Sequence, residues 1–204
     1  CLVGSEMCIR DSVRTVRAFL AVEEIDMVYV GIKPDWHEYT NELFERFGTD
    51  KERIRVIDGG ADRNGTVMNI AEAIVAEHGE NERDIILTHD AVRPFVTEKI
   101  IKDNIEAMAK HSACGTYMPA VDTIIRSDGE KVRETLNRSE LYQAQTPQTF
   151  RLGDLRRNYY SLSEEQNKKL TDTCSVFTAC NEDIYLVVGD AMNFKITTDS
   201  DLRM

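Results

Sequence analysis

An acid and a base, Asp90 and Arg93, closely follow an apolar run at residues 85–87. The run predicts a short buried strand, which Pro94 ends because proline has no N–H to continue a ladder. Both side chains are therefore expected at the carboxyl end of a strand, where open α/β sheets bind their ligands. A carboxylate beside a guanidinium suits a ligand with both hydroxyl and phosphate groups. Taken alone, the segment is explained equally well by a turn that satisfies local backbone groups.

A second segment with chemical potential, residues 58–66, joins a predicted strand at 54–57 to a predicted helix. Gly59 and Gly60 permit close backbone approach, and the helix N-terminus offers free N–H groups at the positive end of a dipole. This suits a phosphate, or the carbonyl and hydroxyl groups of a nucleoside. The spacing matches neither a Walker loop nor the G-x-G-x-x-G fingerprint, so alone it favours an ordinary strand-to-helix turn.

The elements that would position these groups alternate between strand and helix. Strands are predicted at 27–32, 54–57, 85–87, 114–120 and 185–188, and helices at 13–21, 36–47, 98–111, 152–162 and 172–179, with a further helix after Thr66. This alternation predicts an α/β fold with a doubly wound, mainly parallel sheet in one domain over residues 13–204. Thr146-Pro147-Gln148 is predicted to form a rigid turn.

The segment at 121–141 departs from this alternation. Residues 123–126 and 131–136 alternate like the strands of a hairpin around the turn Asp128-Gly129. The hairpin is polar on both faces, so it cannot lie in the core. It is expected to protrude as an arm that needs a partner surface.

Composition excludes several classes of protein. The net charge of −11 argues against a nucleic-acid scaffold, although a local basic cluster could still bind a nucleotide. No apolar stretch approaches the ~20 residues of a membrane span. The five cysteines form no C-x-x-C pair and the four histidines have no metal-ligand spacing. These features favour reduced thiols in a cytoplasm and predict no protein-built metal site.

The first dozen residues do not read like the start of a protein or a signal peptide. They look like a translated adapter sequence, and residues 1–12 are therefore expected to be non-native.

Several of these segments occur in one order and at set intervals. Together they resemble the cytidylyltransferases that couple CTP to a sugar-alcohol phosphate, the group of methylerythritol-phosphate and ribitol-5-phosphate enzymes, over nearly all of residues 13–202. The resemblance implies a Rossmann-like nucleotidyltransferase fold. The motifs that carry it are His89-Asp90-Ala91-Val92-Arg93-Pro94, Gly59-Gly60 with Arg63 and Thr66, Val121-Asp122-Thr123, Asn137-Arg138, Gln145-Thr146-Pro147-Gln148, Leu170-Thr171-Asp172 and Asn193-Phe194-Lys195-Ile196-Thr197.

Within this group the chain is more similar to the ribitol-5-phosphate enzymes. Methylerythritol-type enzymes tend to have Ala where this chain has Val92, and an acid where it has Thr173. The implied reaction transfers a cytidylyl group from CTP to D-ribitol 5-phosphate, giving CDP-ribitol and pyrophosphate, as in teichoic-acid and cell-wall synthesis. The alternative is the 2-C-methyl-D-erythritol 4-phosphate reaction of isoprenoid biosynthesis. Further pointers to ribitol are Phe95, Asp62-Arg63-Asn64 with Met68-Asn69-Ile70, residues 142–148, and residues 160–166 leading to 171–174.

The resemblance also implies roles for individual residues. The protein would stabilise charge, and Mg²⁺ would be bound mainly by the CTP phosphates. Lys195 and Arg138 would be catalytic and would position the acceptor phosphate. The nucleotide would be bound by Gly59, Gly60, Ala61, Asp62, Arg63, Thr66, Asp90, Ala91 and Arg93. The acceptor would be bound by Asp90, Arg93, Thr123, Arg138, Thr146, Thr171 and Thr197.

The arm matches the dimerisation arm of this group. A homodimer is therefore implied, in which Thr123 and Arg138 complete the partner's site. The group also has an early glycine-rich loop whose Arg and Lys bind the triphosphate. Nothing before Val13 matches that loop, so residues 1–204 alone are expected to be inactive.

An interpretation from another class is a non-catalytic α/β nucleotide-binding or signalling module with Asp90 as a receiver-type acid. A receiver needs further acids at neighbouring strand ends. The strand at 27–32 offers none until Asp35, beyond Pro34, and the arm has no purpose in such a module.

Overall fold

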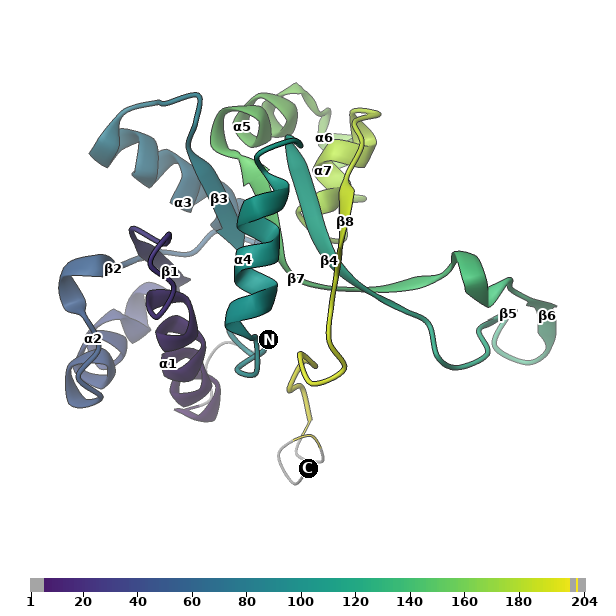
Figure 1. Cartoon of the computed structure of the whole chain (residues 1–204), viewed down its shortest axis with the longest axis horizontal. Helices are drawn as coiled ribbons and strands as arrows, with labels where there is room; N and C mark the ends of the chain where they lie inside the picture. Colours follow the sequence, from purple (N-terminus) through teal and green to yellow (C-terminus); the bar gives the residue numbers. More distant parts are fainter. Residues whose placement is uncertain (1–5, 199–200, 202–204) are drawn as a thin grey trace.

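The computed structural model describes residues 6–198 and residue 201. Its largest sheet has four strands in the order β3 (Ile85–Thr88), β7 (Tyr142–Arg151), β4 (Ala113–Pro119) and β8 (Tyr185–Val188). A second sheet pairs β1 (Val28–Ile32) with β2 (Ile54–Asp58), and lies on the other side of β3 from the arm in Figure 1. The α/β architecture predicted from the alternation of elements is confirmed.

Strand directions support a mainly parallel arrangement with one exception. β1 is parallel to β2, and β4 is parallel to β8. β7 runs antiparallel to both of its neighbours, β3 and β4, which are therefore parallel to each other. β7 thus lies as a single reversed strand between two strands of the opposite direction.

The prediction of a turn at Thr146-Pro147-Gln148 is wrong, because these residues lie inside β7. The ladder between β4 and β7 shifts register between Gly115 and Tyr117, opposite this part of β7. At such an irregularity a proline is tolerated, since its missing N–H is not needed by the ladder. The sequence pattern showed the proline but not the shift that accommodates it.

Helices cover both faces of the four-stranded sheet. Ile86 of β3 packs into a cluster with α3 (Arg63–His78), α5 (Leu152–Ser161) and α7 (Cys174–Ala179). Its neighbour Leu87 packs instead with α4 (Glu98–Ala107). Because successive strand residues point to opposite faces, these two layers lie on opposite sides of the sheet. The doubly wound arrangement is therefore present.

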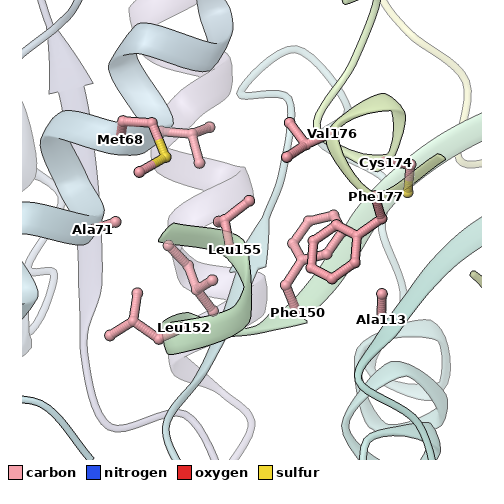
Figure 2. Packing of buried hydrophobic residues seen from close by; sticks show 11 residues of the cluster. Met68, Ala71, Ala113, Phe150, Leu152, Leu155, Cys174, Val176 and Phe177 are labelled. Carbon is pink, nitrogen blue, oxygen red and sulfur yellow. The ribbon is translucent and has the colours of Figure 1, made fainter. Parts of the chain in front are cut away.

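The main core lies under α5 and α7. Figure 2 shows the rings of Phe150 and Phe177 face to face, with ring centroids 4.9 Å apart and both side chains fully buried. Full burial of one such side chain contributes about 1.5–3 kcal/mol to stability. The same cluster includes Met68 of α3 and Leu155 of α5, so it holds the N-terminal half of α3 against the sheet.

Helix α1 (Glu6–Leu20) joins the two sheets. Val13 and Val16 pack with β1, β2 and α2 (His37–Arg46), whereas Phe19 packs against α4. The helix begins inside the segment 1–12 that the sequence suggested is non-native. Residues 1–5 of that segment lie outside the described residues, and its origin stays a prediction.

The arm is the hairpin β5 (Ile125–Ser127) and β6 (Val132–Thr135), paired antiparallel. Gly129 in its turn has a φ of 100°, a conformation that favours glycine. Figure 1 shows the hairpin projecting from the far ends of β4 and β7, with its residues exposed. The predicted protruding hairpin is confirmed.

The remaining short elements are η1 (Pro34–Trp36), η2 (Lys51–Arg53), η3 (Arg138–Glu140) and α6 (Glu164–Asn167). Over the described residues, none of the helices combines the length and apolarity required to cross a bilayer.

Candidate functional site

The carboxylate of Asp90 lies at the centre of a charge cluster at the end of β3. Its Oδ1 is 3.3 Å from Arg63 Nε, and its Oδ2 is 3.4 Å from Arg93 Nε and 3.3 Å from Lys195 Nζ. These cations come from the start of α3, the loop after β3 and the segment after β8. The fold thus brings together three motifs that are far apart in the sequence.

The electrostatics of this cluster favour an anionic ligand. Burial would raise the pKa of Asp90, but the charges of Arg63, Lys195 and Arg93 outweigh burial and lower it to about 2. Asp90 is therefore ionised at neutral pH and cancels only one of the three positive charges around it. The excess positive charge suits a phosphate or a run of phosphates.

Arg63 has a second, uncharged partner. Its Nη1 donates to Thr173 Oγ1 at 2.7 Å, and that hydroxyl donates to Asn64 Oδ1 at 3.3 Å. The Gln148 side-chain carbonyl accepts from the backbone N–H of Thr173, which fixes the start of α7. Because Thr173 is neutral, it orients Arg63 without cancelling its charge.

Lys195 is positioned by contacts between the segment 193–196 and the loop after β3. Ile196 N donates to Val92 O at 2.9 Å, and Arg93 Nη1 donates to Asn193 O at 2.7 Å. The neighbouring rings of Phe95 and Phe194 stack with centroids 5.4 Å apart. The Lys195 side chain remains 36% exposed, so it is held near Asp90 and still open to a ligand.

The turn between β2 and α3 is built by its own side chains. Asp62 caps α3 by accepting from Gly65 N at 2.7 Å. Thr66 Oγ1 accepts from Gly60 N at 2.9 Å and donates to Asp62 O at 2.9 Å. A Cβ on Gly60 would lie 2.3 Å from the carbonyl carbon of Gly65, so this close approach requires glycine.

A family model described as "IspD: 2-C-methyl-D-erythritol 4-phosphate cytidylyltransferase" matches residues 11–204. The chain belongs to the IspD cytidylyltransferase family. A ribitol-5-phosphate cytidylyltransferase of Lactiplantibacillus plantarum is 41% identical over 192 residues, covering 94% of this chain and 82% of the relative. The resemblance found in the motifs is confirmed.

Solved structures of the IspD family have the same fold. A 4-diphosphocytidyl-2C-methyl-D-erythritol synthase of Anaerococcus prevotii gives a TM-score of 0.80 at 28% identity, over 98% of this chain and 85% of that one. The Francisella tularensis 2-C-methyl-D-erythritol 4-phosphate cytidylyltransferase gives 0.79 at 28% identity, over 93% and 83%. The Rossmann-like nucleotidyltransferase fold expected from the motifs is confirmed.

Some of the site residues expected in this IspD-family chain lie away from Asp90. Thr123 and Arg138 are exposed on or beside the arm, where Arg138 Nη1 donates to Val121 O at 2.6 Å. Within the described residues, no hydrogen bond or ion pair connects either of them with the Asp90 cluster. In the described subunit, the two expected catalytic cations, Lys195 and Arg138, therefore have different partners, the Asp90 carboxylate and the Val121 carbonyl.

The other expected contacts are distributed around the cluster. Ala91 is exposed beside Asp90, and its carbonyl accepts from Thr15 Oγ1 at 2.9 Å. Thr171 is exposed before α7, and Thr197 is exposed with its hydroxyl directed to Asp201 Oδ2. Thr146 is instead buried beneath Asp90, with 3% of its surface exposed.

Sequence reasoning missed the supporting contacts of Thr173, Gln148 and Asn193. Each stood inside a motif, but its partner lies far along the chain; Arg63 and Thr173, for example, are 110 residues apart. No spacing rule joins such residues. Only the packing of α3, β7 and α7 brings them together.

Proposed function

We propose that this chain transfers a cytidylyl group from CTP to D-ribitol 5-phosphate, forming CDP-ribitol and pyrophosphate. The observation that carries the proposal is the cluster of Arg63, Arg93 and Lys195 around Asp90 in a chain of this family. The choice of ribitol is supported by the 41% identity to the Lactiplantibacillus plantarum enzyme. That identity exceeds the 28% shared with the methylerythritol-type structures.

In the proposed reaction, a phosphate oxygen of the polyol phosphate attacks the α-phosphorus of CTP. A P–O bond forms there while the bond to the bridging oxygen breaks, and pyrophosphate leaves with that electron pair. Negative charge must be stabilised as the two phosphates meet. We assign this role to Lys195, whose side chain lies 3.3 Å from Asp90 and is 36% exposed.

The nucleotide would occupy the space between the β2–α3 turn and Asp90. We assign the base and ribose to Gly59, Gly60, Ala61, Asp62, Arg63 and Thr66, because this turn offers backbone groups beside the start of α3. Asp90 would accept a hydrogen bond from a hydroxyl, with Ala91 and Arg93 adjacent. Thr171 and Thr197 would contact the acceptor from their exposed positions near the cluster.

Mg²⁺ fits this site as a partner of the CTP phosphates. Asp90, the carboxylate of the cluster, is already engaged by three cations, which disfavours it as a direct metal ligand. Bound Mg²⁺ would neutralise triphosphate charge. Arg63, Arg93 and Lys195 would hold the phosphates from the protein side.

We further propose a homodimer in which the arm serves the partner's site. The arm and its base expose large apolar side chains, including Val121 at 69%, Val132 at 65% and Tyr142 at 47%. Thr123 and Arg138 lie on this exposed excursion and would reach the acceptor phosphate of the second subunit. A cytoplasmic setting accords with the free thiols of Cys114, Cys174 and Cys180.

The second candidate acceptor is 2-C-methyl-D-erythritol 4-phosphate. It is favoured by the description of the matching family model and by the methylerythritol-type structures. The two acceptors share a terminal phosphate and hydroxyl groups. The charge cluster alone therefore does not discriminate between them.

The test is a pyrophosphate-release assay on an extended enzyme, in which the N-terminal segment of the Lactiplantibacillus plantarum relative precedes residue 13. The family resemblance implies a glycine-rich loop in that segment, which this version is designed to supply. Faster CTP-dependent release with ribitol 5-phosphate than with methylerythritol 4-phosphate supports the proposal. The reverse preference would transfer the assignment to the second acceptor, and release with neither would refute both.

A further inference from the structure

Thr146 carries its hydroxyl into a buried position directly under the backbone of Asp90. Only 3% of its surface is exposed. Its Oγ1 accepts a hydrogen bond from Asp90 N at 3.1 Å and lies 3.0 Å from Nδ1 of His89. The hydroxyl is therefore already engaged on both sides by groups of the protein.

The geometry around His89 fixes the direction of these hydrogen bonds. Nε2 of His89 lies 3.1 Å from the carbonyl oxygen of Arg93, which can only accept, so Nε2 carries the proton. In the neutral ring Nδ1 is then an acceptor, and the Thr146 hydroxyl donates to it. The result is a one-way relay from the Asp90 N–H through Thr146 to His89, whose Nε2–H donates to Arg93.

The surroundings of His89 keep the ring neutral. Burial lowers its pKa to about 4, although the hydrogen bond to Arg93 O and the charge of Asp90 act in the opposite direction. The positive charges of Arg93, on the same loop, and Arg63, on α3, lower it further. From α1, the uncharged ring of Phe19 covers His89 at 5.0 Å between centroids.

Through its backbone carbonyl, Thr146 also supports the segment that carries Lys195. Its carbonyl accepts from Asn193 Nδ2 at 2.8 Å, and Asn193 is fully buried. The backbone carbonyl of Asn193 in turn accepts from Arg93 Nη1 at 2.7 Å. One residue of the reversed strand β7 thus holds both the Asp90 loop and the segment that carries Lys195.

We propose that Thr146 and His89 are positioning residues, which set the backbone at Asp90 and so hold its carboxylate between the three cations. Neither side chain needs to touch a substrate in this role. For Thr146 it differs from the acceptor contact that the motif resemblance implied. The proposal deepens the proposed function by naming what preorganises its charge cluster, but its test does not depend on turnover.

The test compares Thr146→Val with Thr146→Ser in residues 1–204, by amide hydrogen exchange and NMR of the histidine rings. Valine keeps the shape but can neither accept from Asp90 N nor donate to His89. We expect exchange of the Asp90 amide to accelerate at least about tenfold relative to the amides of β3 in the valine variant, with serine restoring protection. The wild-type His89 ring should be the neutral Nε2–H tautomer at pH 7.

The matched control is Thr116→Val. Thr116 is also fully buried, on the neighbouring strand β4, and its Oγ1 also makes two hydrogen bonds, to Asn104 and Pro147. This change should leave Asp90 exchange unaltered, since Thr116 does not bond to that loop.

Three outcomes would overturn the proposal. The first is that Thr146→Val and Thr116→Val accelerate hydrogen exchange of the Asp90 amide equally. The second is that Thr146→Ser does not restore protection of that amide. The third is a His89 ring protonated on Nδ1 at pH 7. The tautomer is read in the wild-type chain, so it decides even where a variant does not fold. Because none of these readouts needs CTP or turnover, the cytidylyl-transfer assignment is judged separately.

Discussion

The Asp90 cluster and the arm are built in opposite ways. Asp90 is 14% exposed and is bonded through its carboxylate and its backbone N–H. Arg138 at the base of the arm is exposed, and its guanidinium donates to the carbonyl of Val121. The first region is organised within one chain, whereas the second has a surface without a counterpart in the described subunit. This contrast is what the proposed homodimer requires: one subunit preorganises the nucleotide side, and the partner would supply the arm.

The largest expected effect comes from Lys195→Met in the extended enzyme. This change removes a positive charge 3.3 Å from Asp90 while keeping a chain of similar length. If Lys195 stabilises charge at the reacting phosphates, kcat should fall about a thousandfold, in line with the loss of one such group. Steady-state pyrophosphate release measures it. A loss of less than about tenfold would contradict the catalytic assignment, and unchanged thermal unfolding would exclude a folding defect.

The next effect tests the arm. Arg138→Ala should reduce kcat about a hundredfold while CTP binding, measured by calorimetry, stays unchanged, because the acceptor phosphate loses its partner. Equal loss of both would refute the assignment.

Arg138→Ala also tests whether Arg138 acts in its own subunit's site or in the partner's site. An inactive Lys195→Met subunit mixed with an inactive Arg138→Ala subunit should regain about a quarter of wild-type activity after exchange, since half the dimers would hold one intact site. Such rescue is possible only if Arg138 acts across subunits. Absence of rescue in mixtures that demonstrably exchange would place Arg138 in its own subunit's site.

A smaller effect is expected in the β2–α3 turn. Gly60→Ala would place a Cβ 2.3 Å from Gly65 C, and the overpacking should cost about 1–3 kcal/mol of unfolding free energy. Gly59→Ala is the matched control, because the nearest atom to its Cβ would be Thr66 Oγ1 at 3.4 Å. Denaturant unfolding compares the two. If both variants are equally stable, the turn is not as closely packed as this geometry requires.

The sequence predicted the charged residues of the Asp90 cluster better than the buried residues that hold them in place. Asp90, Arg93, Arg63 and Lys195 were all identified because their motifs occur in a family order, and the fold follows from regular alternation of strands and helices. β7 could not be predicted in the same way, since Pro147 indicated a turn. The supports that depend on β7, above all Thr146 beneath Asp90, were therefore assigned other roles.

The arm shows a different limit of prediction. Its alternating pattern and the Asp128-Gly129 turn revealed the hairpin directly. What the exposed side chains contact is not encoded in any local pattern, because the counterpart is proposed to be a second chain.

The last expected effect, similar in size to that of Gly60→Ala, compares an acid of the cluster with an acid of the arm. The pKa of Asp90 falls from its ordinary value of 3.8 to about 2 on folding. A lowered pKa adds stability that is present above the unfolded value and is lost as pH falls toward the folded value. Asp90 should therefore contribute about 2 kcal/mol at neutral pH that disappears between about pH 4 and 2. The measurement is urea unfolding of the wild type and Asp90→Asn across this range.

Asp128 is the matched control from the arm. Hydrogen bonds from the backbone N–H groups of Lys131 and Glu130 lower its pKa too, but the group is exposed to solvent. Water screens such interactions, so Asp128→Asn should leave the acid dependence of stability close to that of the wild type. If Asp128→Asn flattened the acid limb as much as Asp90→Asn, the low pKa of Asp90 could not be ascribed to its buried cations. The acid dependence of stability would then not distinguish the buried Asp90 cluster from the solvent-exposed arm.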